Sequence, residues 1–466
     1  MTLSIRTAER AYRSVYTSAT PMGERRATGR AARGRVSRRR LADWDPATRG
    51  HDALGTVFAQ NETRIPDLVP IRMSRMSASP WTYFRGAAAV MAADLGTAPH
   101  TGIEVQLCGD AHVLNFGLWA TPERQMSFDL RDFDETVRGP FEWDVKRFLA
   151  SLVVLARDTG LDDRIGLAAV RAALRAYRAR IAHYSTADEL TIWYDMITSD
   201  ELLELFGPEE HEQLSVRLAK RARRRTSAGA ARKLTHVVDG QLRIVDDPPA
   251  RVHISEIVPA GHAAELAAET LQAYHDSLPY ERRRLLDRFT LVDVVRQVVG
   301  VGSVGMQVYL VLLQGRNGKE PLFLQIKQAG PSVYEQFLGP SPYASHGERA
   351  VRGKRQIQAA SDIFLGWTSV RGFDFYVRQF RDMKVIPTGE LIAPHLVPFA
   401  ERCAHVLARS HSRTGDAMAI AGYLGKGRRF DEAMAQFAVA YADQTARDHQ
   451  ELVAAISAGD VATRLG

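Results

Sequence analysis

The ten-residue segment "CGDAHVLNFG", Cys108–Gly117, combines several chemically active side chains in a short loop. Asp110, His112 and Asn115 lie there between apolar runs. Phosphoryl transfer from ATP needs a base beside the acceptor hydroxyl and oxygen ligands that hold Mg²⁺ against the phosphates. We expect Asp110 to be the base and Asn115 to be a Mg²⁺ ligand. His112 is the second catalytic candidate, but we favour a hydrogen-bonding role for it because Asp110 already serves as the base.

A second acidic group follows in "MSFDLRDFDET", residues 126–136. Strand alternation places an apolar row that starts at Met126 on one face, with Asp132 at its end. A carboxylate beside packed apolar side chains requires a cation, so we predict that Asp132 is a Mg²⁺ ligand. Asp134 could bind a second Mg²⁺, and a solvated turn carboxylate is the alternative.

Gly300, Gly302 and Gly305 have the spacing G-x-G-x-x-G, which by itself is weak evidence for nucleotide binding. The residues after them, "MQVYLVLLQG", are β-branched and aliphatic and predict a strand, whereas a dinucleotide-binding turn opens a helix. The pattern favours a glycine-rich hairpin of the kind that covers ATP phosphates in protein kinases. We expect the three glycines to cover a bound nucleotide.

Lys327 ends the next apolar strand, "LFLQIK". A lysine at that position needs an anion, either nucleotide phosphates or, in the simpler interpretation, carboxylates in solvent. A helix glutamate usually holds a phosphate-binding lysine. Glu348, at the beginning of the following helix, is the predicted partner, and Glu335 is the rival.

The elements that position these residues form an α+β pattern. Periodicity and turn residues predict, in chain order, a helix from Pro80, a β-hairpin around "TPERQ", helices over 141–225, three antiparallel strands within 289–330, a helix over 347–366, a strand over 373–380 and helices from 393 onward. We divide the chain into an Arg-rich N-terminal arm (1–60), a helical lobe with the catalytic loop (61–285), a glycine-loop sheet lobe with one helix (286–385), and C-terminal helices that complete the large lobe (386–466).

Composition limits the class of protein. The 466 residues are 45% hydrophobic and 25% charged, which predicts a globular chain with a substantial core. Two cysteines are too few for a disulfide framework and favour a reducing compartment. The N-terminus lacks a signal-length apolar segment, and the longest apolar stretch, residues 298–313, contains polar and glycine interruptions that a membrane span avoids. We therefore expect a soluble, cytoplasmic protein with no membrane partner.

The net charge of +7 is concentrated in two segments, residues 24–40 and 219–233. Arginine clusters bind polyanions by releasing counterions, so a nucleic-acid partner is one alternative. No base-stacking aromatic residues lie among these arginines, and we favour a solvated arm and a solvated helix face.

The segment "CGDAHVLNFG" resembles the H-G-D-x-H-x-x-N catalytic loop of aminoglycoside-phosphotransferase-like kinases, with Cys108 in place of the first histidine. The following "LRDFDETVRGPFEWDVKRFLASL" resembles their metal-binding segment, which implies that Asp132 binds metal and Asp144 is a structural aspartate. Residues 30–455 resemble the bacterial domain-of-unknown-function family 2252, which is grouped with protein-kinase-like folds. The resemblance implies a two-lobed fold that uses ATP and Mg²⁺.

The order of the motifs departs from that of ordinary kinases, in which the glycine loop, lysine and glutamate precede the catalytic loop. Here the catalytic loop comes about 200 residues before the glycines. A circular permutation would explain this order, since "AERCAHVLARSHSR" resembles the helix that normally precedes the catalytic loop. The alternative is that one of the two half-motifs is accidental.

We therefore expect an ATP- and Mg²⁺-dependent phosphotransferase that acts on a hydroxyl-bearing acceptor. Three other functions fit the same residues. The first is transfer of AMP, the second is nucleotide binding without turnover, and the third is nucleic-acid binding through the arginine segments.

Overall fold

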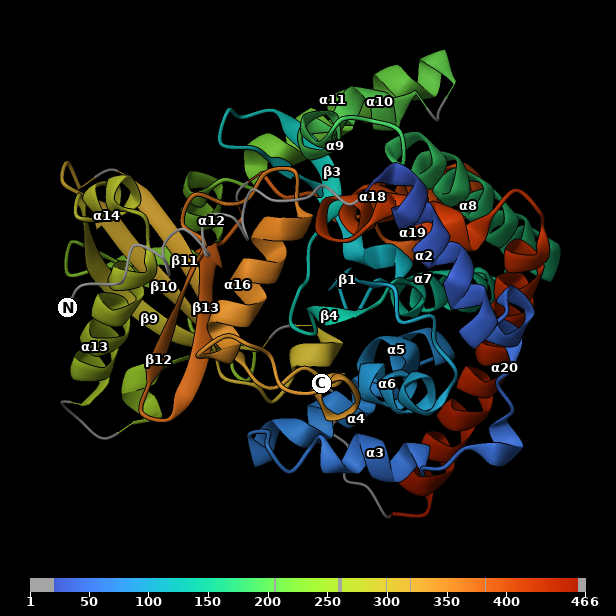
Figure 1. Cartoon of the computed structure of the whole chain (residues 1–466). Helices are drawn as coiled ribbons and strands as arrows, with labels where there is room; N and C mark the ends of the chain where they lie inside the picture. The colour runs from blue at the N-terminus through green and yellow to red at the C-terminus, as the bar shows by residue number, and fades with distance from the viewer. Residues whose placement is uncertain are drawn as a thin grey trace, which may run out of the picture.

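The computed structural model describes residues 21–204, 207–258, 262–298, 300–318, 320–381 and 383–459. The predicted α+β class is confirmed, because many helices accompany antiparallel sheets. Figure 1 shows a sheet-bearing part beside a larger helical part. We call elements α12–β13 the sheet part, and elements α2–α11 together with α17–α20 the helical part.

The helical part combines segments from both ends of the chain. Its N-terminal elements are α2 (Met22–Arg35), α3 (Ala53–Ala59), α4 (Val69–Met76), α5 (Pro80–Gly86), α6 (Ala88–Thr97), β1 (Glu104–Leu107), β2 (Phe116–Ala120), β3 (Met126–Leu130), β4 (Val137–Pro140), α7 (Phe141–Asp158), α8 (Asp163–Tyr184), α9 (Glu189–Tyr194), β5 (Ile197–Thr198), α10 (Ser199–Leu203) and α11 (Pro208–Arg224). Its C-terminal elements are α17 (Gly389–Ile392), α18 (Leu396–Thr414), α19 (Ala417–Leu424) and α20 (Arg429–Ser457).

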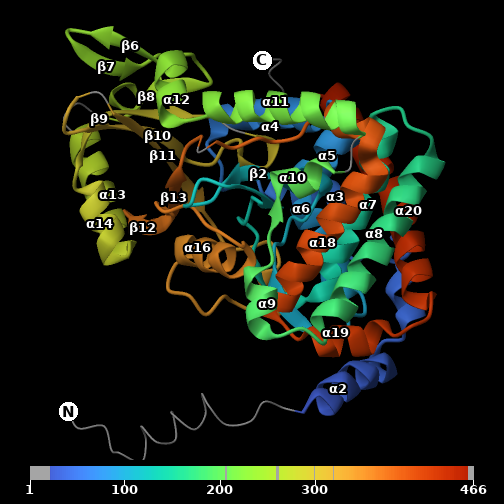
Figure 2. The ribbon, with the colours of Figure 1, turned by 90° about the horizontal axis from the view of Figure 1, so that it is seen from above.

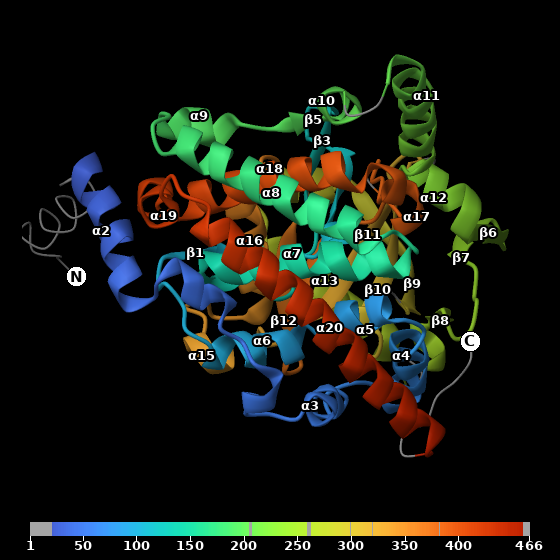
Figure 3. The ribbon, with the colours of Figure 1, turned by 90° about the vertical axis from the view of Figure 1, so that its right-hand side faces the viewer.

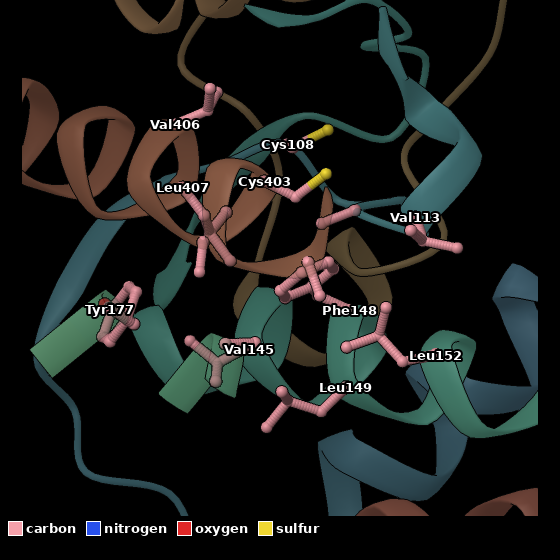
Figure 4. Packing of buried hydrophobic residues seen from close by; sticks show 14 of the residues in the cluster. Cys108, Val113, Val145, Phe148, Leu149, Leu152, Tyr177, Cys403, Val406 and Leu407 are labelled. Carbon is pink, nitrogen blue, oxygen red and sulfur yellow. The ribbon is translucent and has the colours of Figure 1, made fainter. Parts of the chain in front are cut away.

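Helix α7 is the centre of the main core. Its residues from Phe141 to Ala156 are all buried, as expected for a helix surrounded by others. Figure 4 shows Phe148 of α7 close to Cys403 of α18 and near Cys108 of the predicted catalytic loop. Both cysteines are free and buried, so they act as small apolar core residues.

The sheet part contains a six-stranded antiparallel sheet in the order β12-β13-β11-β10-β9-β8. Its elements are α12 (Ser227–Leu234), β6 (Thr235–Val238), β7 (Gln241–Ile244), β8 (Arg251–His253), α13 (His262–Ser277), α14 (Tyr280–Leu286), β9 (Phe289–Gln297), β10 (Val308–Gly315), β11 (Pro321–Ala329), α15 (Glu335–Leu338), α16 (His346–Ile357), β12 (Gly366–Val370) and β13 (Phe373–Gln379).

The predicted strand alternation in β11 is confirmed. Leu322, Leu324 and Ile326 belong to one apolar cluster with residues of α13, whereas Phe323 belongs to a cluster with α12. Lys327 follows the register of Phe323 and lies opposite Val308 of β10. The sheet therefore turns Lys327 away from the α13 side.

The sheet part begins before residue 286, where we placed its boundary. Helix α12 packs Ala230 and Leu234 against the sheet, and α13 packs Ala267 and Tyr274 against the opposite face. An amphipathic pattern predicts that a helix buries one side but does not identify the layer that this side covers. In contrast, α16 was expected on the sheet and packs there through Ala350 and Val351.

The predicted Arg-rich arm is a helix packed on the body of the protein. Residues 1–20 lie outside the described residues, and the next segment forms α2, which lies beside α19 (Figure 3). Gly29 and Ala32 of α2 are buried, because small residues allow the two helices to approach closely. Met22–Arg35 is therefore a helix packed through one side rather than a free arm, and most of its other residues are exposed, as expected of a solvated segment.

The second basic segment is helical, as expected. Helix α11 ends at Arg224, and α12 begins after a short break at Ser227. Among the described helices, none is both long and apolar enough to cross a membrane.

Candidate active site

A cavity of about 1240 Å³ lies between the two parts of the molecule. Figure 2 shows β2 between β13 and the helices of the helical part, and an isolated bridge pairs Leu118 of β2 with Val385 after β13. The cavity brings together residues that are distant in the sequence. The helical part contributes Asp110, His112, Arg131, Asp132 and Asp134, and the sheet part contributes Gly300, Gly302, Gln325, Lys327 and Arg378.

The loop between β1 and β2 is held by a buried carboxylate. Asp144, in the first turn of α7, accepts hydrogen bonds from the backbone amides of Cys108 (2.7 Å) and Gly109 (3.0 Å). His411 Nε2 of α18 lies 3.4 Å from the same carboxylate. Gly109 has φ +84° and a Cβ there would lie 2.2 Å from the Glu135 carbonyl oxygen, so only glycine fits. These contacts support the structural role that the resemblance implied for Asp144.

Asp110 is oriented by a residue that we did not predict. Arg147 of α7 is 1% exposed and donates from Nε to Asp110 Oδ1 at 2.9 Å. The guanidinium also donates to the carbonyl of Phe84 at 2.8 Å and lies 3.9 Å from that ring centroid. These contacts leave the carboxylate 23% exposed at the cavity. Arg147 therefore fixes Asp110 at the cavity wall.

His112 is buried beside Asp110. Its Nε2 lies 3.8 Å from Asp110 Oδ2, and the edge of its ring packs against Trp81. Burial, followed by the nearby Arg85 and Arg147 guanidinium groups, lowers the pKa of His112 well below its ordinary value. Among the described residues its buried Nδ1 has no hydrogen-bond partner, so the expected hydrogen-bonding role is not seen, and the lowered pKa makes the imidazole a weak base.

Three oxygen atoms of the predicted metal ligands are available for a cation. Asn115 donates its amide hydrogens to the carbonyls of Asp110 (2.8 Å) and Asp132 (3.2 Å), which fixes the amide orientation. In the described part of the chain, Asn115 Oδ1, Asp132 Oδ1 and Asp134 Oδ1 are buried and have no hydrogen-bond partner. Carboxylate and amide oxygens are the ligands that Mg²⁺ prefers, so these residues fit that metal.

Lys327 faces the two aspartates across the cavity. Its Nζ lies 3.7 Å from Asp132 Oδ1 and forms an ion pair with Asp134. Burial opposes the charged ammonium, but both carboxylates outweigh it and raise the pKa of Lys327. Burial would likewise raise the pKa of Asp132, but Lys327, followed by Arg378, holds it well below its usual range. Burial and the Asp132 charge raise the pKa of Asp134, so the two aspartates differ in basicity.

The predicted pair between Lys327 and a helix glutamate is absent from the described residues. Glu348 Oε1 lies 3.3 Å from Arg352 Nε, one turn along α16. Glu335 lies 3.1 Å from Arg349 Nε, so the rival does not bind Lys327 either. The prediction was wrong because Asp134, from the opposite wall, reaches the ammonium directly.

The predicted glycine hairpin is present, and its glycines divide into two groups. The loop joins the antiparallel strands β9 and β10, and Gly300 and Gly302 line the cavity. Gly305 has φ +88°, and its carbonyl accepts a hydrogen bond from the Ile65 amide at 2.7 Å. A Cβ at Gly305 would lie 2.8 Å from Cβ of Arg64. Gly305 therefore anchors the loop to the helical part, while the other two face the cavity.

Several cationic residues of the cavity were not predicted. Arg85, Arg131, Arg378 and Lys384 all line it. Alternation in "FDFYVRQF" could have placed Arg378 on the same face as Tyr376, in register with the Lys327 strand. Lys384 follows β13 in a loop, where periodicity gives no orientation.

Comparison with known families matches residues 64–455 to the family described as "Uncharacterized protein conserved in bacteria (DUF2252)". No curated protein and no solved structure matches the chain.

Proposed function

The chain belongs to this DUF2252 family of bacterial proteins, and we propose that it is an ATP- and Mg²⁺-dependent phosphotransferase acting on a hydroxyl-bearing acceptor. The distance of 3.7 Å between Lys327 Nζ and Asp132 Oδ1 carries the proposal. Kinases hold nucleotide phosphates with a lysine from the strand after the glycine loop, and hold Mg²⁺ with an aspartate from the opposite wall. Lys327 and the neighbouring Asp134 are 193 positions apart in the sequence, so the fold, not local sequence, creates this pair.

The chain order supports a permuted kinase-like arrangement of two lobes. From β9 onward the chain runs through the glycine loop, the Lys327 strand, α16, two further strands and the long helix α18, which is the order of an ordinary kinase up to its catalytic loop. Helix α18 then ends at Thr414. Its hydroxyl accepts a hydrogen bond from the backbone N–H of Gln106 in β1 at 3.1 Å. Strand β1 leads directly into the 108–117 loop. In space, α18 is therefore followed by β1 and the predicted catalytic loop, as in an ordinary kinase, although α18 comes after both in the chain.

Each residue at the cavity has a proposed role. Asp110, fixed by Arg147, orients the acceptor hydroxyl and accepts its proton. Asn115, Asp132 and Asp134 would hold Mg²⁺, which when bound neutralises charge on the phosphate oxygens. Lys327 exchanges its carboxylate partner for phosphate oxygens, and Gly300 and Gly302 offer backbone that can approach them closely. Positioning and charge stabilisation supply most of the rate gain in this chemistry.

Asp132→Asn tests the proposal. We expect it to reduce phosphoryl transfer at least 100-fold, because one carboxylate of the metal site is neutralised. ATP with Mg²⁺ at a hundredfold excess over Kd should stabilise the wild type by about 2.7 kcal/mol, and the variant should lose the Mg²⁺-dependent part. Thermal shift and transfer from γ-labelled ATP measure both effects.

The exposed Asp67 provides the matched control, since Asp67→Asn removes the same charge at a residue that does not line the cavity. It should behave as the wild type does. If Asp132→Asn kept the full Mg²⁺-dependent stabilisation, or if ATP did not stabilise the wild type, the proposal would be wrong.

Transfer of AMP is the second candidate, because the additional cations Arg131, Arg378 and Lys384 line the same cavity and could bind phosphates other than the terminal one. Comparison of products from α-labelled and γ-labelled ATP distinguishes the two transfers. Stabilisation by ATP without any labelled product would indicate nucleotide binding alone. Nucleic-acid binding is less favoured, because Arg25 pairs with Asp416 at 2.8 Å and Arg33 bonds the α19 backbone.

A further inference from the structure

A small cationic pocket lies beside the main cavity. It has a volume of about 40 Å³, room for roughly three water-sized groups. Arg131, Arg378, Gln379 and Lys384 line both spaces, so the two lie side by side. The residues that line the pocket are Trp119, Ala120, Arg131, Lys354, Gln358, Asp362, Arg378, Gln379 and Lys384.

The four cations of the pocket come from three separate segments of the chain. Arg131 follows β3, Lys354 lies in α16, Arg378 lies near the end of β13, and Lys384 lies in the loop after it. All four are partly buried. A charge run on a solvated surface does not produce this arrangement, because the fold must bring the segments together.

The carboxylates near the pocket are already occupied. Asp362 accepts hydrogen bonds from the backbone amides of Phe364 (2.8 Å) and Gln379 (2.5 Å). The buried Asp129 pairs with Arg409 at 2.5 Å and accepts from the Ala359 amide at 2.8 Å. Neither carboxylate therefore has its full charge available for the lysines.

The cations themselves lack anionic partners. Within the described ranges, no carboxylate forms an ion pair with Arg131, Lys354 or Lys384, and Arg378 donates to the neutral amide oxygen of Gln325 at 2.8 Å. In the part of the chain that the structure describes, Arg131 Nε is buried without a hydrogen-bond partner. Asp362 lines the pocket, and its charge together with that of Asp132 favours the charged forms of Lys354 and Arg378 without forming an ion pair with either. Asp132 itself faces Lys327 and the proposed metal.

Like charges held together in a partly buried pocket destabilise the protein unless an anion joins them. In agreement, burial and then the Arg378 charge lower the pKa of Lys354 to about 8. A phosphate group carries one or two negative charges and accepts hydrogen bonds from both ammonium and guanidinium groups. It would therefore offset the repulsion that the protein leaves uncompensated.

We propose that Arg131, Lys354, Arg378 and Lys384 form a binding site for a phosphate group of a substrate, next to the wall that carries Asp132. That this phosphate belongs to a substrate rests on the proposed function, whereas the binding of phosphate does not. Two sources share this chemistry. The group is either a phosphate of the nucleotide or a phosphate already present on the acceptor.

Lys354→Met and Lys384→Met test the site, with the exposed Lys233→Met of α12 as the matched control. Methionine keeps the apolar stem and removes the charge. Without ligand, the two pocket variants should melt at the wild-type temperature or above it, because each substitution removes a repulsive charge. A lower melting temperature would instead indicate that the lysine stabilises the fold. Inorganic phosphate should raise the melting temperature of the wild type and of Lys233→Met more than chloride at equal ionic strength does. In the pocket variants its affinity should fall at least tenfold.

Saturating ATP with Mg²⁺ distinguishes the two sources. If a phosphate of the nucleotide fills the pocket, inorganic phosphate should no longer raise the melting temperature once ATP is bound. If a phosphate of the acceptor fills it, the increases caused by ATP and by inorganic phosphate should add. Asp132→Asn should keep its response to phosphate even if the proposed activity is wrong, so the two proposals fail separately. A wild-type response to phosphate no larger than that to chloride, or an undiminished response in both pocket variants, would overturn the site.

Discussion

Single buried charges in this protein differ in whether the fold provides partners for them. Asp129 is fully buried and accepts hydrogen bonds from Arg409 and from two backbone amides. Lys146 of α7 is 2% exposed, and its Nζ lies 4.4 Å from the Phe437 ring centroid. The nearby Glu142 accepts hydrogen bonds from the amide and the hydroxyl of Thr101, so its charge is already shared. Burial therefore lowers the pKa of Lys146 to about 8.

Lys146→Met should raise the free energy of unfolding at pH 7 by about 1–3 kcal/mol, because the folded protein must keep a charge that burial disfavours. Between pH 8 and the ordinary lysine value of 10.5 the unfolded chain binds a proton that the folded chain has released. Wild-type stability therefore rises with pH across this window. Urea unfolding of both proteins from pH 7 to pH 10.5 measures the difference. A gain that stayed constant with pH would contradict the assignment.

Residue types and spacing predicted the cavity residues whose chemistry is local. Asp110 and Asn115 share one loop, and Asp132 follows a strand whose alternation predicts its direction. Glu348 was misassigned because helix periodicity gives a face, not the partner across a cavity. Arg147 was not predicted, because a single arginine in an apolar helix sequence cannot be distinguished from a surface charge until the residues that surround it are known.

At the scale of elements, the contact between α2 and α19 depends on the absence of side chains. A Cβ on Gly29 would lie 1.8 Å from the Ala419 carbonyl oxygen, so the helices touch backbone to backbone. Arg33 and Arg38 extend the contact by donating to the carbonyls of Tyr423 (2.9 Å) and Leu424 (2.7 Å) at the end of α19. Cations at a helix C-terminus also interact favourably with its dipole.

Gly29→Ala should destabilise the protein by about 1–3 kcal/mol, because the added methyl group pushes the two helices apart. Gly34→Ala is the control in the same helix, since a Cβ there meets nothing within 4 Å. The control should stabilise by about 0.5–1 kcal/mol through helix propensity. Urea unfolding measures both changes, and faster tryptic cleavage within α2 reports its release. Equal effects of the two substitutions would contradict the close packing.

Helices and strands with a clear hydrophobic periodicity could be predicted from the sequence. The layer of the fold in which each one packs could not. The hairpin β2–β3, the strands β9–β11 and the final helices have the expected order. Helix α2 was not predicted, because its buried residues are glycine and alanine, which give little hydrophobic periodicity among the arginines. Helix α13 showed its apolar side, but only the folded sheet identifies the face that it covers.

At the scale of the whole molecule, one buried arginine joins the two parts. Arg349 of α16 is 1% exposed and donates to the carbonyls of Thr136 (2.6 Å) and Asp134 (2.7 Å) in the helical part. It also donates to the Gly330 carbonyl at 2.8 Å. Tyr334 adds a hydrogen bond to the Gly109 carbonyl at 2.8 Å. The predicted metal segment and the predicted catalytic loop are thus both bonded to the sheet part.

Arg349→Met should lower the free energy of unfolding by about 3–5 kcal/mol, because it leaves buried carbonyls and Glu335 without their cation. Arg352→Met, one turn further along α16, removes an arginine that is 47% exposed and should cost about 1 kcal/mol or less. Urea unfolding followed by both fluorescence and circular dichroism measures the change. In Arg349→Met we expect the fluorescence and circular dichroism transitions to occur at different urea concentrations. Transitions that coincide, with only a small decrease in the free energy of unfolding, would contradict the role of Arg349 in linking the two parts.

The bonds between α2 and α19 also have a consequence for biosynthesis. Arg33 and its acceptor at Tyr423 are 390 positions apart, so the ribosome adds all the residues between them before the end of α19 emerges. Until then the glycine and alanine surface of α2 lacks α19 as its neighbour, and Arg33 lacks its carbonyl acceptor. A nascent chain therefore carries a cationic segment past ribosomal RNA, and arrival of α19 ends that exposure.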